Sequence, residues 1–518
     1  MLVSDILEQA FRHHPEKPAV WYKGLWKTYR ELRTGAEQIA AFLIEAGVKP
    51  GDRVALLLEN SFEYVCAHFG VLKAGAVDVS LNTELKAEGL HELLLDCEAK
   101  ALIADTRLLL GSIEALDGLP ALRHVLLDQP IKGASSLPSQ VQVHTLSDML
   151  PVDGAEVQPP RRMDGDLASL VYTSGVTGKP KGVMLSHVNL VSNARSVVQY
   201  LGLGPQDRMM VILPFYYIYG RSLLYTHVLT GGSLVIDNRF AYPVTILNTM
   251  QEQEVTCLAG VPTTYSILLN RSDLRARTFP HLRFVAQAGG GMSKAMQKAV
   301  AEVFHPARLF VMYGSTEAAP RLTYVEPEML PCKWGSIGRA IPDMEVVVAD
   351  EQGRRLPPHV QGEIAARGPS IMMGYWKDPE ATAQVLRHGY YFTGDLGFAD
   401  EDGYIFLTGR ARDMIKTGGN RVSAKEIEDV VSSIPGVLET AVIGVADEIL
   451  GEAIKVFLVP ASPELTEDVV KNELRQRLPL FKHPKWVEFR QGLPKNQSGK
   501  ILKSELAEQE THRQRSHD

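Results

Sequence analysis

Short apolar runs alternate with amphipathic segments along the first two thirds of the chain. The runs are almost continuously apolar, which is typical of strands buried on both faces of a parallel sheet. Several of the intervening segments have helical spacing. The pattern predicts buried strands at 52–59, 77–82, 100–105, 209–214, 232–237, 255–260 and 283–289, and helices at 61–76 and 293–304. This order indicates an α/β fold with mostly parallel, helix-flanked sheets.

The pattern changes near Pro342. Hairpin strands are expected within 344–368, and a final unit is expected with helices at 424–434 and 466–478 and strands at 439–447 and 452–461. These elements predict a large N-terminal domain, 1–410, whose last part, about 342–410, is a β subdomain. A small α+β C-terminal domain, 411–518, follows. The polar end, 507–518, is expected to fray.

Composition narrows the class of protein. At 518 residues the chain exceeds one ordinary hydrophobic core, and its 45% hydrophobic and 22% charged residues are typical of a soluble globular protein. A net charge of −7 without a basic block argues against a nucleic-acid partner. The four cysteines lie far apart without a CxxC pair, which argues against a zinc site or a disulfide framework. The sequence has no signal-like start and no apolar run of membrane-spanning length, so we expect a cytoplasmic protein.

The stretch "YTSGVTGKPKG", 172–182, indicates a phosphate-binding loop. Glycines let backbone N–H groups surround an anion, and Thr173, Ser174, Thr177 and Lys181 add donors and charge. The stretch differs from the nucleoside-triphosphatase loop, in which a Lys followed by Ser or Thr leads directly into a helix. Here Gly182 follows the lysine, and 183–185 reads as a short strand.

Five other stretches carry candidate chemistry. They are "AQAGGGM" (286–292), "VMYGSTEA" (311–318), "YFTGDLG" (391–397), "TGRARDMIKTGGNR" (408–421) and "PKNQSGKILKSEL" (494–506). Loops at the carboxyl ends of strands are where α/β proteins bind ligands. In this order and spacing, the stretches resemble the adenylate-forming superfamily over essentially the whole chain. That superfamily contains acyl-CoA synthetases, aryl-CoA ligases, luciferases and the adenylation domains of peptide synthetases.

The resemblance implies a two-step reaction. A carboxylate attacks the α-phosphorus of ATP, which gives an acyl-adenylate and pyrophosphate, and a thiol then attacks the acyl carbon and releases AMP. The implied cofactors are ATP, Mg²⁺ and coenzyme A or a phosphopantetheine arm. The implied partner is a small carboxylic acid, with an acyl carrier protein as the alternative acceptor. The protein is expected to be a monomer or a homodimer, with a mobile C-terminal domain.

The resemblance also implies roles for individual residues. Lys500, Glu317 and Thr173 are the expected catalytic residues, and Glu317 is also the expected Mg²⁺ ligand. The expected ATP and thiol-cofactor residues are Thr173, Ser174, Gly175, Thr177, Gly178, Lys181, Gly289, Gly290, Tyr313, Gly314, Thr316, Asp395, Arg410, Lys416 and Arg421. Tyr313 is expected to stack on adenine, Asp395 to bind ribose and Arg412 to act as the hinge. For Lys416 and Arg421, a solvated face is the alternative.

The acyl site is expected at Tyr217, Tyr219 and Gly291. The segment "PFYYIYG", 214–220, has no acid that could pair with the ammonium group of an α-amino acid, so this substrate class is disfavoured. Aromatic walls and glycines suit a medium- or long-chain fatty acid, with an aromatic acid as the alternative. Two departures from the family pattern are Val176 for Ser or Thr, and Tyr217 for a common His. The remaining alternatives are luciferase-like oxidation and an inactive binding protein.

Overall fold

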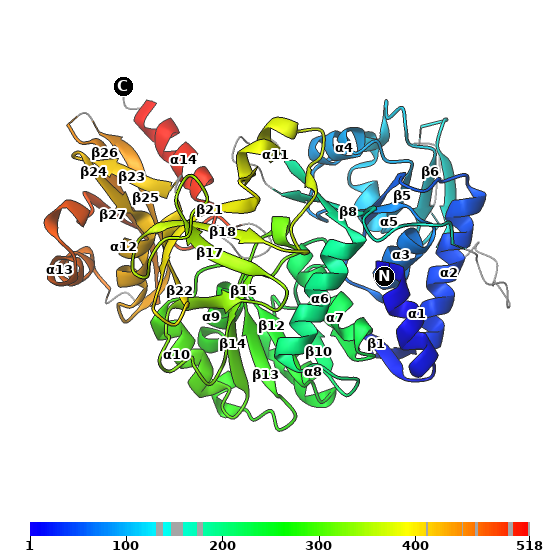
Figure 1. Ribbon diagram of the computed structural model, residues 1–518, viewed down its shortest axis with the longest axis horizontal. Helices are drawn as coiled ribbons and strands as arrows, with labels where there is room; N and C mark the ends of the chain where they lie inside the picture. Colours follow the sequence, from blue (N-terminus) through cyan, green and yellow to red (C-terminus); the bar gives the residue numbers. More distant parts are fainter. Residues whose placement is uncertain are drawn as a thin grey trace.

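A computed structural model describes residues 1–130, 138–146, 159–173, 180–410, 413–447, 449–461, 465–495 and 501–515. Two large sheets with helices between and around them form most of the chain, and a small α+β unit lies at one end (Figure 1). The predicted fold class, α/β with mostly parallel helix-flanked sheets and a smaller C-terminal unit, is confirmed.

The eight-stranded sheet carries the segment predicted to bind phosphate. Its order is β19 (Gly374–Tyr375), β9 (Lys181–Ser186), β8 (Leu167–Thr173), β4 (Val77–Ser80), β3 (Arg53–Leu57), β5 (Ala101–Ala104), β6 (His124–Leu127) and β7 (Gln142–Thr145). Strands β8, β4, β3, β5, β6 and β7 are parallel, whereas β9 is antiparallel to both β8 and β19. The predicted short strand after the phosphate loop is therefore confirmed as part of β9.

The second sheet has fourteen strands. Its order is β17 (Glu345–Ala349), β18 (Gly362–Arg367), β21 (Tyr390–Ala399), β22 (Ile405–Arg410), β16 (Ser336–Ala340), β15 (Thr323–Val325), β14 (Arg308–Tyr313), β13 (Phe284–Gln287), β12 (Cys257–Gly260), β10 (Arg208–Val211), β11 (Ser233–Ile236), β1 (Pro18–Tyr22) and β2 (Leu25–Thr28), with β20 (Leu386–Arg387) on β21. The middle strands are parallel, and pairing from β14 onward to β17 is antiparallel. The strands of the expected β subdomain thus continue the parallel sheet.

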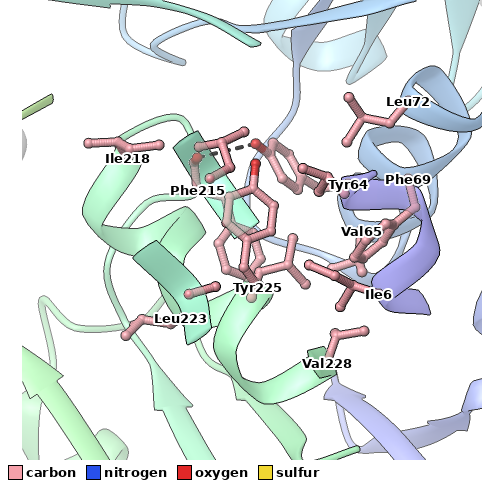
Figure 2. Packing of buried hydrophobic residues seen from close by; sticks show 14 of the residues in the cluster. Ile6, Tyr64, Val65, Phe69, Leu72, Phe215, Ile218, Leu223, Tyr225 and Val228 are labelled. Atoms are coloured by element: carbon pink, nitrogen blue, oxygen red, sulfur yellow. Dashed lines mark hydrogen bonds between the residues drawn. The ribbon is translucent and has the colours of Figure 1, made fainter. Parts of the chain in front are cut away.

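One hydrophobic core joins the two large sheets. It contains Val54 of β3 and Val211 of β10, both fully buried. Its helices are α1 (Val3–His13), α2 (Tyr29–Glu45), α3 (Phe62–Lys73), α6 (His187–Leu201) and α7 (Ile218–Leu229). Helix α3 is apolar nearly all round, as expected for a helix enclosed by protein, and its Tyr64 lies beside Tyr225 of α7 (Figure 2). The other helices of this part are α4 (Ala87–Asp96), α5 (Thr106–Leu110), α8 (Pro243–Glu252), α9 (Pro262–Asn270), α10 (Lys294–Val303) and α11 (Pro379–Val385).

The C-terminal unit is built on a five-stranded sheet. Its order is β24 (Asn420–Ser423), β23 (Met414–Thr417), β26 (Gly451–Pro460) and β25 (Val437–Asp447), with β27 (Trp486–Phe489) on β26. Helices α12 (Ala424–Ser432) and α13 (Glu467–Arg477) share one core with this sheet, and α14 (Lys503–Arg515) contributes to a second core. No helix in the described ranges combines the length and apolar content needed to cross a membrane.

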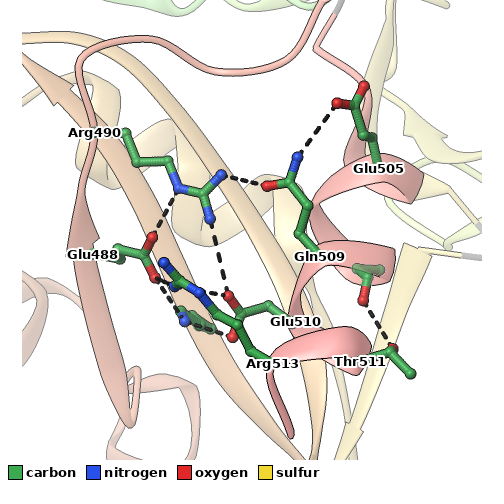
Figure 3. Close-up of polar contacts among 9 residues, drawn as sticks. Glu488, Arg490, Glu505, Gln509, Glu510, Thr511 and Arg513 are labelled. Carbon is green, nitrogen blue, oxygen red and sulfur yellow. Dashed lines mark hydrogen bonds and ion pairs between the residues drawn. The ribbon is translucent and has the colours of Figure 1, made fainter. Parts of the chain in front are cut away.

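The expectation that 507–518 frays is wrong for the described part, because α14 continues to Arg515. Leu506 is fully buried against the sheet, and Glu510 pairs with Lys455 at 2.6 Å. Arg490 adds a hydrogen bond to Gln509 at 2.6 Å (Figure 3). One buried leucine and several ion pairs therefore anchor a helix whose sequence is otherwise polar.

Candidate active site

Two residues predicted to bind phosphate lie side by side at the end of the β8–β9 ladder. Thr173 ends β8 and Lys181 begins β9, and they are partners in the ladder. The Thr173 hydroxyl lies 3.5 Å from the backbone oxygen of Lys181. Ser174, Gly175, Thr177 and Gly178 lie outside the described residues. The described structure thus fixes both ends of the predicted loop.

Tyr375 connects this ladder to the predicted metal ligand. Its hydroxyl donates a hydrogen bond to Oε1 of Glu317 at 2.9 Å, and Nζ of Lys181 lies 5.0 Å from the centre of its ring. Burial, together with the charge of Glu317, raises the pKa of Tyr375, so the hydroxyl stays protonated and donates. Sequence reasoning missed Tyr375, because a two-residue strand gives almost no pattern and its pairing with β9 is not local.

The turn after β14 places Tyr313, Thr316 and Glu317 at the carboxyl edge of the sheet. Gly314 is required by a close approach, since a Cβ there would lie 1.9 Å from the backbone oxygen of Pro320. The backbone oxygen of Glu317 accepts a hydrogen bond from the N–H of Met372 at 2.8 Å. This turn is therefore fixed from both sides, as a ligand-binding turn at a strand end requires.

The predicted adenine and ribose residues also meet. The Tyr313 hydroxyl donates to Oδ2 of Asp395 at 2.6 Å, and Nε of Arg410 donates to Oδ1 at 2.7 Å. Asp395 and Arg410 face each other across the β21–β22 ladder. Burial and the nearby Asp395 carboxylate raise the pKa of Tyr313. Burial alone would lower the pKa of Arg410, but the nearby acidic groups, Asp395 first among them, together outweigh burial and raise that pKa. Hydrogen bonds from Tyr313 and Arg410 therefore orient both oxygens of the Asp395 carboxylate.

The two tyrosines expected at the acyl site lie at the start of α7. Tyr217 is half-buried directly before the helix, with its ring 4.6 Å from that of Tyr216. Tyr219 is 8% exposed, and its hydroxyl lies 3.4 Å from the backbone oxygen of Gly260 and 3.3 Å from that of Ala286. Tyr219 is thus fixed against the ends of β12 and β13.

The three glycines after β13 face different neighbours. A Cβ on Gly289 would lie 3.8 Å from the Tyr219 ring, and one on Gly290 would lie 3.3 Å from the Pro262 ring. A Cβ on Gly291 would instead lie 3.8 Å from Nζ of Lys425 in α12. The structure therefore places Gly289 beside Tyr219, and Gly291 toward the C-terminal unit.

The C-terminal candidates are only partly described. Lys416 is exposed on β23, and no described contact joins its side chain to Tyr313, Glu317 or Asp395. Arg421 pairs with it in the β23–β24 ladder, but the Arg421 side chain is outside the described set. Arg412 and Lys500 also lie outside the described residues.

Comparison with known proteins identifies the family. Residues 7–376 match the AMP-binding enzyme family, and residues 426–500 match the AMP-binding enzyme C-terminal domain. The chain belongs to the AMP-binding enzyme family. The predicted superfamily and the predicted class of AMP-forming acid–thiol ligase are confirmed.

Relatives of this AMP-binding enzyme cover nearly its whole length. A long-chain-fatty-acid–CoA ligase of Escherichia coli O6:H1 is 34% identical, over 98% of this chain and 94% of that protein. A feruloyl-CoA synthase of Amycolatopsis sp is 35% identical, over 96% of each chain. The structure of an anthranilate CoA ligase in complex with anthranoyl-AMP has a TM-score of 0.90 at 28% identity, over 98% of this chain and 97% of that one.

The carboxylates near the predicted nucleotide site suit a metal ion that binds together with ATP. The described ranges contain no group of three or more His, Cys, Asp or Glu side chains placed to hold a metal. Glu317 offers one half-buried carboxylate, and none of the described residues donates a hydrogen bond to its Oε2. Mg²⁺ is commonly held by one or two carboxylates plus substrate phosphates and water, so Glu317 fits Mg²⁺ that arrives with ATP.

Proposed function

We propose that this enzyme activates a medium- or long-chain fatty acid with ATP and transfers the acyl group to coenzyme A. ATP, Mg²⁺ and coenzyme A are its cofactors. The observation that carries the proposal is the joining of Asp395, Tyr313 and Arg410 at one sheet edge, beside the Lys181–Tyr375–Glu317 contacts. A nucleoside-binding carboxylate next to a cation and a metal ligand is what attack on the α-phosphorus of ATP requires.

Each group has a proposed role in the first step. Lys181 and Thr173, with Ser174, Gly175, Thr177 and Gly178, hold the β- and γ-phosphates. Thr316 binds the α-phosphate, and Glu317 holds Mg²⁺, which neutralises phosphate charge when bound. Asp395 accepts both ribose hydroxyls and Arg410 orients it. Adenine lies between the Tyr313 ring and the backbone of Gly289, Gly290 and Gly314. Lys500 stabilises the negative charge that develops in the transition state.

We propose that the C-terminal domain moves between the two steps. We place its boundary between residues 410 and 411 and its hinge at Arg412. Ser423 in β24 already contacts the backbone oxygen of Thr408 in β22, so this junction is tight. Movement would withdraw Lys500 from the reacting phosphate and bring Lys416 and Arg421 toward the thiol cofactor.

Arg412→Pro fixes φ at the hinge, so this variant should keep the rate of adenylation and lower the rate of thioester formation. An assay of each half-reaction measures the two rates separately.

The acid is proposed from the residues expected at the acyl site and from the relatives. Tyr217 and Tyr219 provide aromatic surface beside Gly289, which suits an alkyl chain. The long-chain-fatty-acid–CoA ligase relative supports this class. An aromatic acid is the second candidate, because a feruloyl-CoA synthase is equally similar in sequence and the anthranoyl-AMP complex is similar in fold. Pyrophosphate release with fatty acids and with aromatic acids distinguishes these two substrate classes. Transfer of the acyl group to coenzyme A or to a holo carrier protein identifies the acceptor.

Asp395→Asn is expected to weaken ATP binding about 10- to 100-fold, since hydrogen bonds to a charged group contribute about 1.5–3 kcal/mol. The amide keeps the size of the side chain but removes its charge and one acceptor. Equilibrium binding of ATP measures the change. Asp400→Asn is the matched control, because Asp400 pairs with Lys333 at 2.7 Å, outside this group of contacts. Equal ATP affinity in wild type and Asp395→Asn would contradict the ribose assignment.

Tyr375→Phe is expected to lower metal affinity about tenfold, as loss of a hydrogen-bond partner to a metal ligand does. The ring over Lys181 is kept and only the bond to Glu317 is lost. Binding of Mn²⁺ in the presence of a non-hydrolysable ATP analogue, followed by electron paramagnetic resonance, measures the affinity without turnover. Tyr390→Phe is a matched control, because its hydroxyl donates to Glu345 at 3.0 Å. Equal losses in both variants would show a general effect of tyrosine removal.

A further inference from the structure

Arg321 is a buried arginine whose charge no described residue neutralises. The residue is 2% exposed, and its Nε has no hydrogen-bond partner in the described ranges. Its side chain contacts the hydroxyl of Tyr200, a neutral group, and no described Asp or Glu forms an ion pair with it. By contrast, the buried Arg221 pairs with Asp78. A buried charge is costly unless it is paired and hydrogen-bonded. Among the described residues, this guanidinium group therefore has no counter-charge.

Arg321 lies beside the proposed acyl site. Its Cζ is 3.9 Å from the centre of the Tyr219 ring, and the same ring borders Gly289. Its backbone is fixed, because its carbonyl oxygen accepts a hydrogen bond from Asn193 at 2.9 Å and its Cα packs against Gly314. Arg321 thus reaches the acyl wall from the turn that carries Glu317.

Stacking on Tyr219 suits an arginine that binds a ligand. A guanidinium on an aromatic face uses its flat surface for that contact, and its N–H groups at the edge remain suited to a carboxylate. A carboxylate can accept two parallel hydrogen bonds from these N–H groups. Such charge-assisted, bidentate pairs are stronger than hydrogen bonds between neutral groups. An unsubstituted alkyl chain would supply no negative charge to this guanidinium group.

We propose that the substrate supplies the missing counter-charge, and that the acid carries a second carboxylate which Arg321 binds. This inference rests on the proposed function and narrows it from simple fatty acids to aliphatic dicarboxylic acids. The first carboxylate is adenylated, and the second stays ionised against Arg321. Arg321 then determines specificity without taking part in the transfer of the acyl group.

The test compares three series of acids of equal chain length: monocarboxylic, ω-hydroxy and α,ω-dicarboxylic, each from four to sixteen carbons. Pyrophosphate release gives kcat/KM for each acid. We expect the best dicarboxylic acid to exceed its monocarboxylic counterpart at least about tenfold, because a site built for a polar group rejects a ligand that lacks it. Equal kcat/KM for the two series would overturn the proposal. ω-Hydroxy acids as good as dicarboxylic acids would overturn the requirement for charge.

Variants assign the preference to Arg321. Arg321→Met should remove the preference for dicarboxylic acids and spare monocarboxylic acids, and Arg321→Lys should restore part of it. Arg339→Met removes a surface arginine that pairs with Glu326, and should leave the preference intact. An equal loss for both series in Arg321→Met would show that Arg321 only supports the fold. If that variant does not fold, the wild-type comparison of the three series still decides. Lack of pyrophosphate release with every acid, aromatic acids included, would refute the proposed function itself.

Discussion

Replacing Lys500 with alanine is expected to slow acyl-adenylate formation by about 10²–10³-fold, the loss typical for one preorganised donor at a developing charge. Two anions, the carboxylate and ATP, must approach each other in this step, so a positioned cation contributes most in its transition state. Transfer of a pre-made acyl-adenylate to the thiol should continue at a similar rate. Pyrophosphate exchange measures the first half-reaction, and thioester formation from the synthetic adenylate measures the second.

The residues that flank Lys500 provide a control. Lys495 and Ile501 pair in an isolated bridge, and the N–H of Leu502 donates to the backbone oxygen of Pro494 at 2.8 Å, so the two flanks are held against each other. Lys503 has a structural partner in Glu428 at 2.7 Å. Lys503→Ala should therefore leave adenylation almost unchanged. If Lys500→Ala slowed both half-reactions equally, its assignment to the first step would be wrong.

Residues in contiguous motifs could be predicted, whereas residues brought in by strand pairing could not. Asp395 and Tyr313 were expected in one nucleotide site, and they are hydrogen-bonded at 2.6 Å. Tyr375 reaches Glu317 from 58 residues away, through a strand of only two residues. No local periodicity encodes such a contact, because it depends on the register of β19 against β9.

The direction in which each residue of a turn faces could not be predicted from the sequence either. The sequence indicates that 289–291 is a glycine-rich turn, but not which glycine faces the substrate. Gly289 has φ of +83° and faces Tyr219, whereas Gly291 faces Lys425. Backbone dihedral angles at a turn set these directions, and glycine permits several of them. The buried arginine beside Tyr219 was missed for a related reason, since its burial depends on packing between α7 and the turn after β14.

A buried ion pair joins helix α7 to the eight-stranded sheet. Asp78 lies on β4, Arg221 lies on α7, and both side chains are fully buried and in contact. Arg221 also donates to the hydroxyl of Ser169 on β8 at 2.9 Å. Burial alone would raise the pKa of Asp78, but Arg221 and His68 outweigh it and lower that pKa to about 2 from 3.8. The pair therefore stays charged at neutral pH.

Acid should weaken this contact in a defined range of pH. The pKa of Asp78 is lower in the folded than in the unfolded chain, so its ionisation stabilises the folded state above pH 3.8, and that stabilisation is lost as pH falls toward 2. In the variant Asp78→Asn, this contribution to the slope of stability against pH should be absent. Unfolding by urea at a series of pH values between neutral and acid measures it.

Arg221→Met is expected to lower the free energy of unfolding by about 3–5 kcal/mol, because it leaves Asp78 buried without a counter-charge. The double variant Asp78→Leu with Arg221→Met should recover much of this loss, since an apolar pair of similar volume needs no charge compensation. Arg30→Met is the control: Arg30 pairs with Glu16 at 2.6 Å, and the two side chains are 55% and 69% exposed, so about 1 kcal/mol or less is expected. Urea unfolding followed by tryptophan fluorescence measures all three. A loss in Arg221→Met no larger than in Arg30→Met would show that the buried pair does not hold α7 against the eight-stranded sheet.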